Sequence, residues 1–484
     1  MLNNEEVIQA LENGEISIDE ALRQLTDERA TDGNGLTIGR LVAIQRGNDP
    51  ATIRCSGDRN VNWGITGKNS EATQIQSTDI FRMYSVTKML TAHIIMQLVS
   101  EAKLKLDNKI IALLPDMLQP LDGSEENKIK LNKDATISDV LMHLSGITNY
   151  PDNPDFMTTA NANPGKKWTI EETVSYTPPG SKIRGGFAYS DTGYNLLGMI
   201  AQKVTGRDYY TLATLAAKNI GLEHTYFYPD IPDCGEVLTQ GYAMNPITKL
   251  PISHLEVDTS FAAGGMFSSA NDMLRLAKLS HQRFLNDPSD QLFVPMQGIT
   301  PSRHINGPNQ GKYAYGVMRQ EMVDGNPFYG HGGYGRGGRT KVFYFPKRDT
   351  SVVILETYET ITPIIAKELA KEQPAYQNVN KTILLLRDAY TDDSGKFNRS
   401  DMFAAWKQGI HVVIERIANP ASRESRNPLN PATFVVSDNT KSTSSSMGFE
   451  VKTTPPLNSE TNEKYQQPFA EKIPSRTPEG NREV

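Results

Sequence analysis

A serine and a lysine stand three residues apart at the start of an apolar stretch of this chain. Ser85 and Lys88 are followed by residues 89–99, in which only three residues are polar. If this stretch is helical, it would be buried on every side. A helical spacing of three places the hydroxyl and the amine on one face. Because burial makes a lysine lose its proton more easily, the pair could provide a serine nucleophile with a proton acceptor.

The same spacing recurs at Ser100 and Lys103, so the spacing alone is weak evidence. Ser100 begins a polar run at the far end of the predicted helix, whereas Ser85 stands where a loop meets a buried helix. The first turn of a helix also has free backbone N–H groups and the positive end of the helix dipole, which favour negative charge near Ser85. Ser85 is therefore the candidate nucleophile.

The elements that would hold this helix are strands near both ends of the globular region, with a helical part between them. Short apolar or alternating runs between glycine-rich turns predict antiparallel strands. These runs are 36–45, 51–55, 61–65, 340–346 and 349–355. From about residue 115 to 260, helical patterns alternate with loops rich in Asn, Asp and Pro. We expect an α/β fold of the α+β kind, with an antiparallel sheet flanked by helices and an inserted helical subdomain.

Composition divides the chain into four parts. Residues 1–30 carry eight acidic and two basic side chains and predict two short helices. We assign 1–32 as an acidic helical extension, which is either solvated or a docking element for a partner protein. The main domain covers 33–390, and 391–418 adds a C-terminal helix. Residues 419–484, rich in Pro, Ser, Thr and Asn, are expected to be disordered because they hold too little apolar surface.

Composition also excludes several classes of function. The net charge is −6 over 484 residues, and no basic stripe indicates nucleic-acid binding. The two cysteines and eight histidines show no ligand-like spacing, so neither a metal nor another cofactor is expected. No apolar run approaches the ~18 residues that span a bilayer. No secretory signal is visible, which predicts a cytoplasmic protein, although the tail could also serve a specialised export system.

Two further motifs complete a set with the serine–lysine pair. A Tyr-Ser-Asp triplet occupies 189–191, after a Pro-Pro-Gly turn, and a His-Gly-Gly triplet occupies 331–333, before a predicted strand. With these motifs in this order, residues 36–360 resemble the serine beta-lactamase-related family. That family includes class C beta-lactamases, D-alanyl-D-alanine carboxypeptidases, D-amino-acid-specific peptidases and family VIII esterases.

The resemblance implies a mechanism in which Ser85 attacks a carbonyl group and forms an acyl-enzyme. Lys88 and Tyr189, the latter as phenol or phenolate, would move protons between the nucleophile and the leaving group. The backbone N–H groups of Ser85 and Tyr334 would form the oxyanion hole. The residues that the resemblance places at the substrate are Asp191, His331, Gly333 and Tyr334.

Asp191 departs from the pattern of the family, in which many members carry asparagine at this position. An amide can donate a hydrogen bond to a substrate carbonyl, whereas an ionised carboxylate can only accept one. Asp191 is also expected to pair with Lys88 and keep it charged, which weakens the lysine as a base. We hypothesise that Asp191 narrows activity against amide-bearing substrates, beta-lactams above all.

His331 stands where class C enzymes have lysine, a variation that peptidases and esterases of the family share. A histidine can change its charge near neutral pH. Arg336 and Arg339 could add positive charge for a substrate carboxylate, although positions on a strand surface are the simpler interpretation of both. His143, in the short helix predicted over 136–146, is expected to be a packed or surface residue rather than a catalytic one.

These expectations lead to a serine hydrolase of the esterase or D-alanyl-D-alanine carboxypeptidase-like class, acting on a small-molecule or peptide acyl substrate. Two alternatives stay open. One is an acyltransferase that uses the same acyl-enzyme. The other is a catalytically silent protein that binds acyl ligands, or other proteins through the N-terminal hairpin or the tail. Intact Ser85, Lys88 and Tyr189 argue against the silent alternative, because a pure binder has no need of all three.

Overall fold

The computed structural model describes most of the chain up to residue 359 and short segments beyond it. The described residues are 4–27, 36–59, 74–125, 128–163, 165–179, 185–227, 238–239, 241–244, 251–253, 259–282, 293–296, 311–322, 324–359, 369, 371, 374–377, 385–386, 389–390, 402, 405 and 410–418. The strand predicted at 61–65 and the tail at 419–484 lie outside them. Much of the segment 391–418, predicted to hold a C-terminal helix, also lies outside them.

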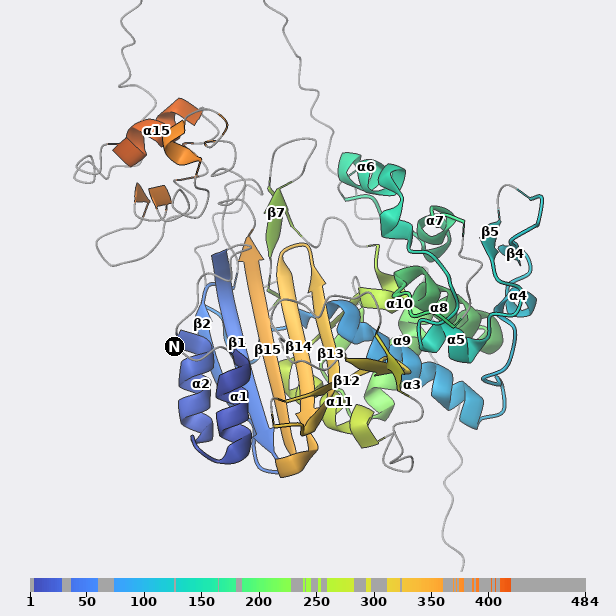
Figure 1. Cartoon of the computed structure of the whole chain (residues 1–484), viewed down its shortest axis with the longest axis horizontal. Coiled ribbons are helices and arrows are strands. Elements are labelled where there is room, and N and C mark those ends of the chain that lie inside the picture. Colours follow the sequence, from blue (N-terminus) through green and yellow to red (C-terminus); the bar gives the residue numbers. More distant parts are fainter. Residues whose placement is uncertain are drawn as a thin grey trace, which may run out of the picture. The chain divides into compact units, whose positions relative to one another are not determined.

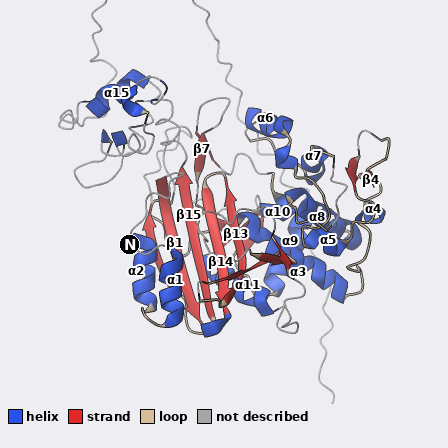
Figure 2. Ribbon diagram, viewed as in Figure 1, coloured by secondary structure: helices blue, strands red, loops and turns tan. Residues whose placement is uncertain are grey.

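The principal sheet is antiparallel along its main path, which confirms the predicted fold class (Figure 1, Figure 2). In spatial order its strands are β10 (Val294–Pro295), β11 (Lys312–Ala314), β12 (Val317–Glu321), β13 (Pro327–Gly335), β14 (Gly338–Phe345), β15 (Thr350–Glu359), β1 (Leu36–Arg46) and β2 (Thr52–Gly57). Leu41 of β1 pairs with Leu355 of β15. Strands from the two ends of the domain are therefore neighbours in the sheet. A short parallel bridge joins β15 to the hairpin of β7 (Tyr242–Met244) and β8 (Pro251–Ser253).

Both faces of the sheet are covered, and the side chains of its central strands divide between them. Along β1, Leu41 and Ala43 belong to the core on one face, whereas Val42 and Ile44 belong to the core on the other. β14 and β15 divide in the same way. Side chains alternate between the faces of a strand, so a strand buried on both faces is apolar throughout. This explains the continuous apolar runs in the sequence.

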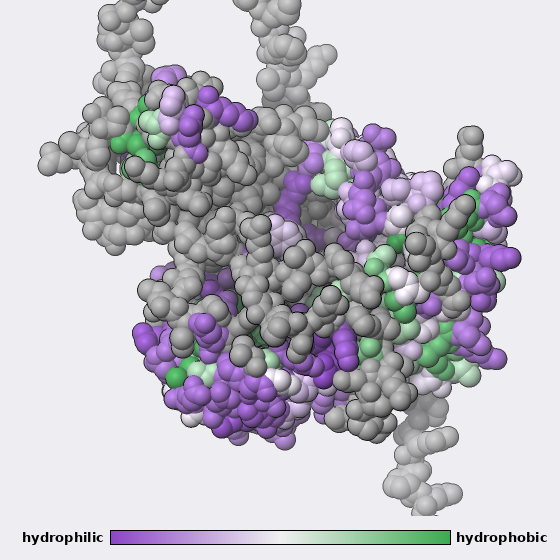
Figure 3. Space-filling model, viewed as in Figure 1, coloured by the Kyte–Doolittle hydropathy of each residue, from purple (hydrophilic) through white to green (hydrophobic). Residues whose placement is uncertain are grey.

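The outer face is covered by the N-terminal hairpin of α1 (Asn4–Asn13) and α2 (Ile18–Asp27) (Figure 1). Both helices form where the sequence predicts them. Val7, Leu11 and Leu25 are buried in the same core as the sheet, and burial of each such side chain is worth ~1.5–3 kcal/mol. The apolar face of the hairpin is therefore buried against the sheet rather than solvated. A docking role for the rest of the hairpin stays a prediction. The outward surface is hydrophilic (Figure 3).

The inner face packs against α11 (Ala270–Gln282), and the helix that follows Ser85 is surrounded by other helices. That helix, α3 (Thr87–Ser100), is the central buried helix that the sequence predicts, since Met89, Leu90 and Ile95 are fully buried. The helices packed around α3 are α8 (Asp191–Thr205), α9 (Tyr209–Asn219) and α10 (Phe261–Gly264).

Smaller elements connect these layers. Between α3 and α8 lie α4 (Ile110–Leu113), β4 (Leu118–Pro120), β5 (Ile129–Leu131), α5 (Ile137–Leu141), α6 (Pro154–Ala162) and α7 (Ile170–Ser175). A second small sheet, in the order β3 (Phe81–Arg82), β9 (Met266–Ser268), β6 (Thr225–Phe227), leads into the turn that carries Ser85. The last described helix is α15 (Ile410–Ala418). Within the described ranges, no helix has both the length and the apolar character to cross a membrane.

Candidate active site

Ser85 lies in a single 3-10 turn, η1 (Tyr84–Val86), between β3 and α3. The chain makes a sharp corner here, because Tyr84 has a φ of +49°, a left-handed conformation that bulky residues rarely adopt. The Tyr84 hydroxyl donates a hydrogen bond to the backbone carbonyl of Arg336 at 2.9 Å. This contact anchors the corner to the turn between β13 and β14. The corner places Ser85 at the N-terminal end of a buried helix.

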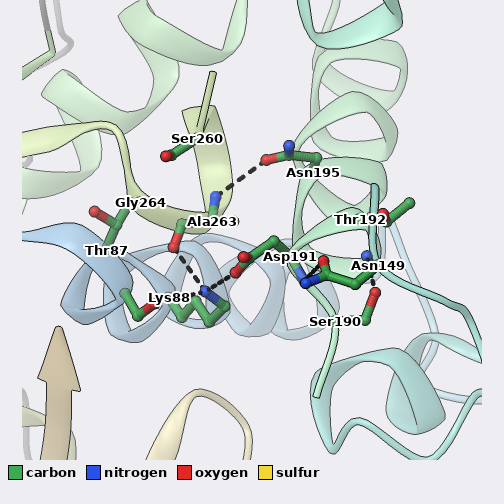
Figure 4. A network of polar contacts seen from close by, with 12 residues as sticks. Thr87, Lys88, Asn149, Ser190, Asp191, Thr192, Asn195, Ser260, Ala263 and Gly264 are labelled. Carbon is green, nitrogen blue, oxygen red and sulfur yellow. Dashed lines mark hydrogen bonds and ion pairs between the residues drawn. The ribbon is translucent and has the colours of Figure 1, made fainter. Parts of the chain in front are cut away.

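Lys88 extends from the first turn of α3 and is fully buried. Its Nζ lies 3.1 Å from Ser85 Oγ, so the two side chains meet as their spacing predicts. The amine also donates hydrogen bonds to Asp191 Oδ1 at 2.6 Å and to the Ala263 carbonyl at 2.8 Å (Figure 4). Burial lowers the pKa of Lys88, while the carboxylate of Asp191 opposes that shift. The predicted pairing of Lys88 with Asp191 is confirmed.

Tyr189 lies beside the same lysine. Its ring centroid is 4.8 Å from Lys88 Nζ, and its phenol is close enough to Ser85 for that side chain to influence its pKa. Burial raises the pKa of Tyr189 well above its usual value of 10, and the nearby negative charge of Asp191 adds to that shift. The side chain is therefore a neutral phenol in this site. The structure brings Ser85, Lys88 and Tyr189 into one cluster.

The start of α8 fixes the position of Asp191. Ser190 caps the helix, since its hydroxyl accepts a hydrogen bond from the Gly193 N–H. The backbone N–H of Asp191 donates a hydrogen bond to Asn149 Oδ1 at 2.9 Å, and Asn149 lies beside Asp191 in Figure 4. The side chain of Asp191 is 26% exposed, whereas that of Lys88 is not exposed at all. The carboxylate thus connects a buried amine to the solvent side of the site.

Gly333 allows β13 to pass close to the corner that carries Ser85. A Cβ atom at position 333 would lie 2.5 Å from the Met83 carbonyl oxygen and 3.3 Å from the Ser85 nitrogen. A side chain there would push the strand away from the corner. The next residue, Tyr334, has its side chain 65% exposed. The strand lies beside the N–H of Ser85, while a role for the Tyr334 N–H in an oxyanion hole stays a prediction.

His331 is fully buried, which corrects the expectation that it changes charge near neutral pH. Burial lowers its pKa to about 3, and the nearby Lys88 adds to that shift. Its Nδ1 lies 2.5 Å from the Gly332 carbonyl, and its Nε2 lies 3.2 Å from the Tyr313 hydroxyl. A neutral imidazole that donates from Nδ1 can accept at Nε2. His331 is therefore an uncharged, buried group that contacts Tyr313 and Gly332. These observations give no support for a role in binding substrate through its charge.

His143 is packed, as predicted, but it packs against the candidate catalytic tyrosine. Its ring centroid lies 4.3 Å from that of Tyr189 and 4.8 Å from that of Tyr313. Nδ1 accepts a hydrogen bond from the Ser190 N–H at 3.1 Å. The residue has a φ of +58°, and burial lowers its pKa well below 6.5. His143 is therefore a neutral support for the Tyr189–Ser190 segment.

The two arginines considered for substrate binding make contacts within the protein. Arg336 donates a hydrogen bond to Asn161 Oδ1 at 2.6 Å and so connects the β13–β14 turn to α6. The Arg339 guanidinium lies 5.3 Å from the centre of the Tyr334 ring. Both positions lie in or beside the β13–β14 hairpin, in agreement with the simpler interpretation of these residues.

Sequence reasoning missed the groups that hold the site through backbone contacts. Ala263 directs its carbonyl at Lys88 because its N–H donates a hydrogen bond to Asn195 Oδ1 at 3.1 Å (Figure 4). Asn149 holds the backbone of Asp191 in a similar way. A carbonyl oxygen is present at every residue, so no local pattern distinguishes the one at position 263. These contacts could be found only once the segments were placed in space.

Residues 57–362, more than half of the chain, match the family model described as Beta-lactamase. The chain belongs to the beta-lactamase family. The match includes every residue of the Ser85, Lys88 and Tyr189 cluster and the strand that carries Gly333. The resemblance found in the sequence motifs is therefore confirmed.

Curated proteins of other organisms match part of the chain. It is 32% identical over 157 residues to a putative D-alanyl-D-alanine carboxypeptidase of Escherichia coli (strain K12), covering 31% of this chain and 34% of the relative. It is 33% identical over 162 residues to an N-acetylmuramyl-L-alanine amidase of Bacillus subtilis (strain 168), covering 32% and 35%. The alignments thus span about a third of the length of these two relatives.

Solved structures share the fold over most of their length. A D-stereospecific amidohydrolase from Streptomyces sp. superposes with a TM-score of 0.55 at 21% identity, covering 71% of this chain and 94% of the other. The D-amino acid amidase of Ochrobactrum anthropi SV3 gives 0.55 at 18% identity, covering 70% and 91%. At these identities the likeness concerns the fold of the beta-lactamase family.

Proposed function

We propose that this member of the beta-lactamase family is a serine hydrolase that cleaves an ester or amide through an acyl-enzyme. Ser85 is the nucleophile, and Lys88 and Tyr189 are the proton-transfer groups. The observation that carries the proposal is the contact between the serine hydroxyl and a buried amine. Ser85 Oγ lies 3.1 Å from Lys88 Nζ, and the Tyr189 ring centroid lies 4.8 Å from the same amine. Acyl transfer needs such groups on the nucleophile, whereas a passive pocket does not.

The opposite pKa shifts of the two groups indicate different roles. Burial lowers the pKa of Lys88, so its neutral amine becomes easier to form and can accept the proton of Ser85. Burial raises the pKa of Tyr189 well above 10, so the resting phenol is a donor rather than a phenolate base. A pair of groups whose environments move their pKa values apart is suited to acid and base roles in one site.

In acylation, Ser85 Oγ bonds to the substrate carbonyl carbon while its proton passes to Lys88. When the tetrahedral intermediate collapses, Tyr189 protonates the leaving group and regains a proton from Lys88. In total, one proton is transferred from Ser85 to the leaving group. Water then attacks the acyl carbon, its proton returns to Ser85, and the acid is released. The N–H groups of Ser85 and Tyr334 would hold the carbonyl oxygen, each worth about 3 kcal/mol in the transition state.

The named activities of similar proteins support this reaction class. A carboxypeptidase and an amidase are among the curated relatives, and an amidohydrolase and a D-amino acid amidase are among the structures with this fold. Each of these names denotes cleavage of an amide bond. An amide, or the more reactive ester, is therefore the bond that we assign to the site.

The proposal is tested by intact-protein mass spectrometry after incubation with a fluorophosphonate, a penicillin or p-nitrophenyl butyrate. We expect a covalent adduct or steady ester turnover in the wild type, and neither in Ser85→Ala. Ser100→Ala is the matched control, because Ser100 begins the same Ser-x-x-Lys spacing at the exposed end of α3. Folded wild-type protein that neither reacts nor turns over would favour the binding-protein alternative. Transfer of the acyl group to an added alcohol in place of water would identify an acyltransferase.

A further inference from the structure

Asp191 is an acidic side chain in direct contact with the proton-transfer group of the site. Its Oδ1 accepts a hydrogen bond from Lys88 Nζ at 2.6 Å, and its backbone is held by Asn149. Among the residues that the structure describes, this contact with Lys88 is the only hydrogen bond of the carboxylate. A second oxygen, Oδ2, therefore has the capacity to accept a hydrogen bond from a ligand. Because the side chain is 26% exposed, that ligand can reach it.

The groups around Asp191 leave one of its carboxylate oxygens available to a substrate. Lys88 contacts the other oxygen, Oδ1, from the buried side. The nearby imidazoles of His143 and His331 are neutral, since burial lowers both of their pKa values. Tyr189 is a neutral phenol. A substrate group that enters beside Asp191 thus meets an acceptor. A carboxylate cannot donate, so it favours N–H groups and above all an ammonium, and disfavours a carbonyl oxygen.

The distances allow one substrate to contact Ser85 and Asp191 together. Lys88 Nζ is 3.1 Å from Ser85 Oγ and 2.6 Å from Asp191 Oδ1, so the two oxygens are no further apart than the sum of these distances. A carbonyl carbon poised for attack lies about 3–3.5 Å from the nucleophile. An amine on the adjacent carbon lies about 2.5 Å from that carbonyl carbon. Such an amine comes within hydrogen-bonding reach of Asp191 while the carbonyl faces Ser85.

We propose that Asp191 binds a protonated amine on the acyl part of the substrate, so that the enzyme selects esters and amides of amino acids with a free α-amine. This inference rests on the proposed acyl-enzyme function. It explains why a carboxylate that weakens Lys88 as a base is present in the site: the same group recognises the substrate. Acyl groups whose amine is capped lose the ammonium contact and place a carbonyl oxygen near the carboxylate, so they are poorer substrates.

The test compares the p-nitroanilides of three acyl groups: alanyl, in both D and L forms, N-acetylalanyl and propionyl. The propionyl compound lacks the amine without adding bulk. We expect wild-type kcat/KM to favour the better alanine enantiomer over both others by about tenfold or more. In Asp191→Asn this preference should fall to within about threefold, mainly through a higher KM for alanine. Asp155→Asn, which alters an exposed carboxylate in the first turn of α6, should keep the wild-type preference.

The outcomes separate this inference from the function on which it rests. If the fluorophosphonate labels Ser85 but the wild type treats the three substrates alike, the ammonium site is wrong and the hydrolase stands. The same holds if Asp191→Asn, shown to be folded by its labelling, keeps the full preference for alanine. If Ser85 is not labelled and no substrate is turned over, the proposed function fails, and this inference fails with it.

Discussion

The rings of His143 and Tyr189 pack together, with centroids 4.3 Å apart. The same imidazole accepts a hydrogen bond from the backbone N–H of Ser190. One side chain therefore restrains both the candidate proton donor and the residue that follows it. The described contacts of His143 are with the Tyr189 ring and the Ser190 backbone, so we assign it as a positioning residue rather than a catalytic one.

Replacing His143 should therefore reduce turnover through Tyr189. In His143→Ala, the tyrosine ring gains freedom and the Ser190 N–H loses its acceptor. We expect kcat for p-nitrophenyl butyrate to fall at least about tenfold, with a smaller change in KM. The loss of a buried ring should also lower the free energy of unfolding by about 2–4 kcal/mol. Steady-state kinetics and urea unfolding measure the two effects.

His281→Ala is the control for that change. The His281 ring packs on two tyrosines of the sheet, with centroids 4.5 Å from Tyr329 and 4.9 Å from Tyr344. Its removal should lower stability but leave kcat within about twofold of the wild type. Equal losses of kcat in the two variants would show that the effect of His143 is only structural.

The contact between Lys88 and Asp191 should determine how acylation depends on pH. In the proposed mechanism the neutral amine is the base, so labelling of Ser85 by an uncharged fluorophosphonate should become faster as pH rises through the pKa of Lys88. Burial lowers that pKa from 10.5, and Asp191 raises it in opposition. Asp191→Asn should therefore move the rise to lower pH and speed up labelling at neutral pH. A rise that stays in place, or moves to higher pH, would contradict the assignment of Lys88 as the base.

Neighbouring glycines on β13 provide a matched pair of substitutions. A Cβ at Gly333 would lie 2.5 Å from the Met83 carbonyl oxygen, whereas a Cβ at Gly332 meets no atom within 4 Å. Gly333→Ala should displace the corner that carries Ser85 and reduce kcat/KM by about a hundredfold. Gly332→Ala should stay within about twofold. Similar activity in both variants would mean that close approach of this strand is not needed.

Substitution of Asp191 should also change activity against beta-lactams. An asparagine amide can donate a hydrogen bond to a carbonyl of the substrate, which the carboxylate cannot do. We expect Asp191→Asn to turn over nitrocefin at least about tenfold faster than the wild type. Absorbance measurements of nitrocefin hydrolysis check this, with Ser85→Ala as the blank. An unchanged rate would mean that the carboxylate of Asp191 does not limit the rate of beta-lactam hydrolysis.

The buried side chain of Glu12, in the N-terminal hairpin, should make the stability of the protein depend on pH. The side chain is 2% exposed, and burial raises its pKa from 4.5 despite the opposing effects of Thr350 and Arg46. A raised folded-state pKa stabilises the fold below the unfolded-state pKa, and this contribution is lost as pH rises through the folded-state value. The stability of Glu12→Gln relative to the wild type should therefore be greater at pH 8 than at pH 5.

Urea unfolding at the two pH values measures that gain. Glu15→Gln, at an exposed position just beyond α1, is the control and should show little change with pH relative to the wild type. A relative stability of Glu12→Gln that is constant or falls with pH would show that Glu12 does not carry a burial cost in the folded protein.

The parts of the fold and the site that the sequence predicts are those set by local geometry. Ser85 and Lys88 are neighbours in any helix that starts at the serine, and the apolar run after them is compatible only with burial. The alternating and apolar runs likewise predict β1, β14 and β15 as strands. Their order in the sheet could not be derived in this way, because it depends on pairing between segments that are far apart in the chain.

Tertiary structure alone decided the charge states and the covering of the sheet. His331 is neutral because distant segments bury it and place Lys88 and Tyr313 beside it. The outer face of the sheet receives α1 and α2, although the apolar stripe of the hairpin is equally compatible with a partner protein. Burial and neighbouring charge fix a pKa, and packing fixes the use of an apolar face. Both come from residues remote in sequence, so neither could be predicted from the segment that carries them.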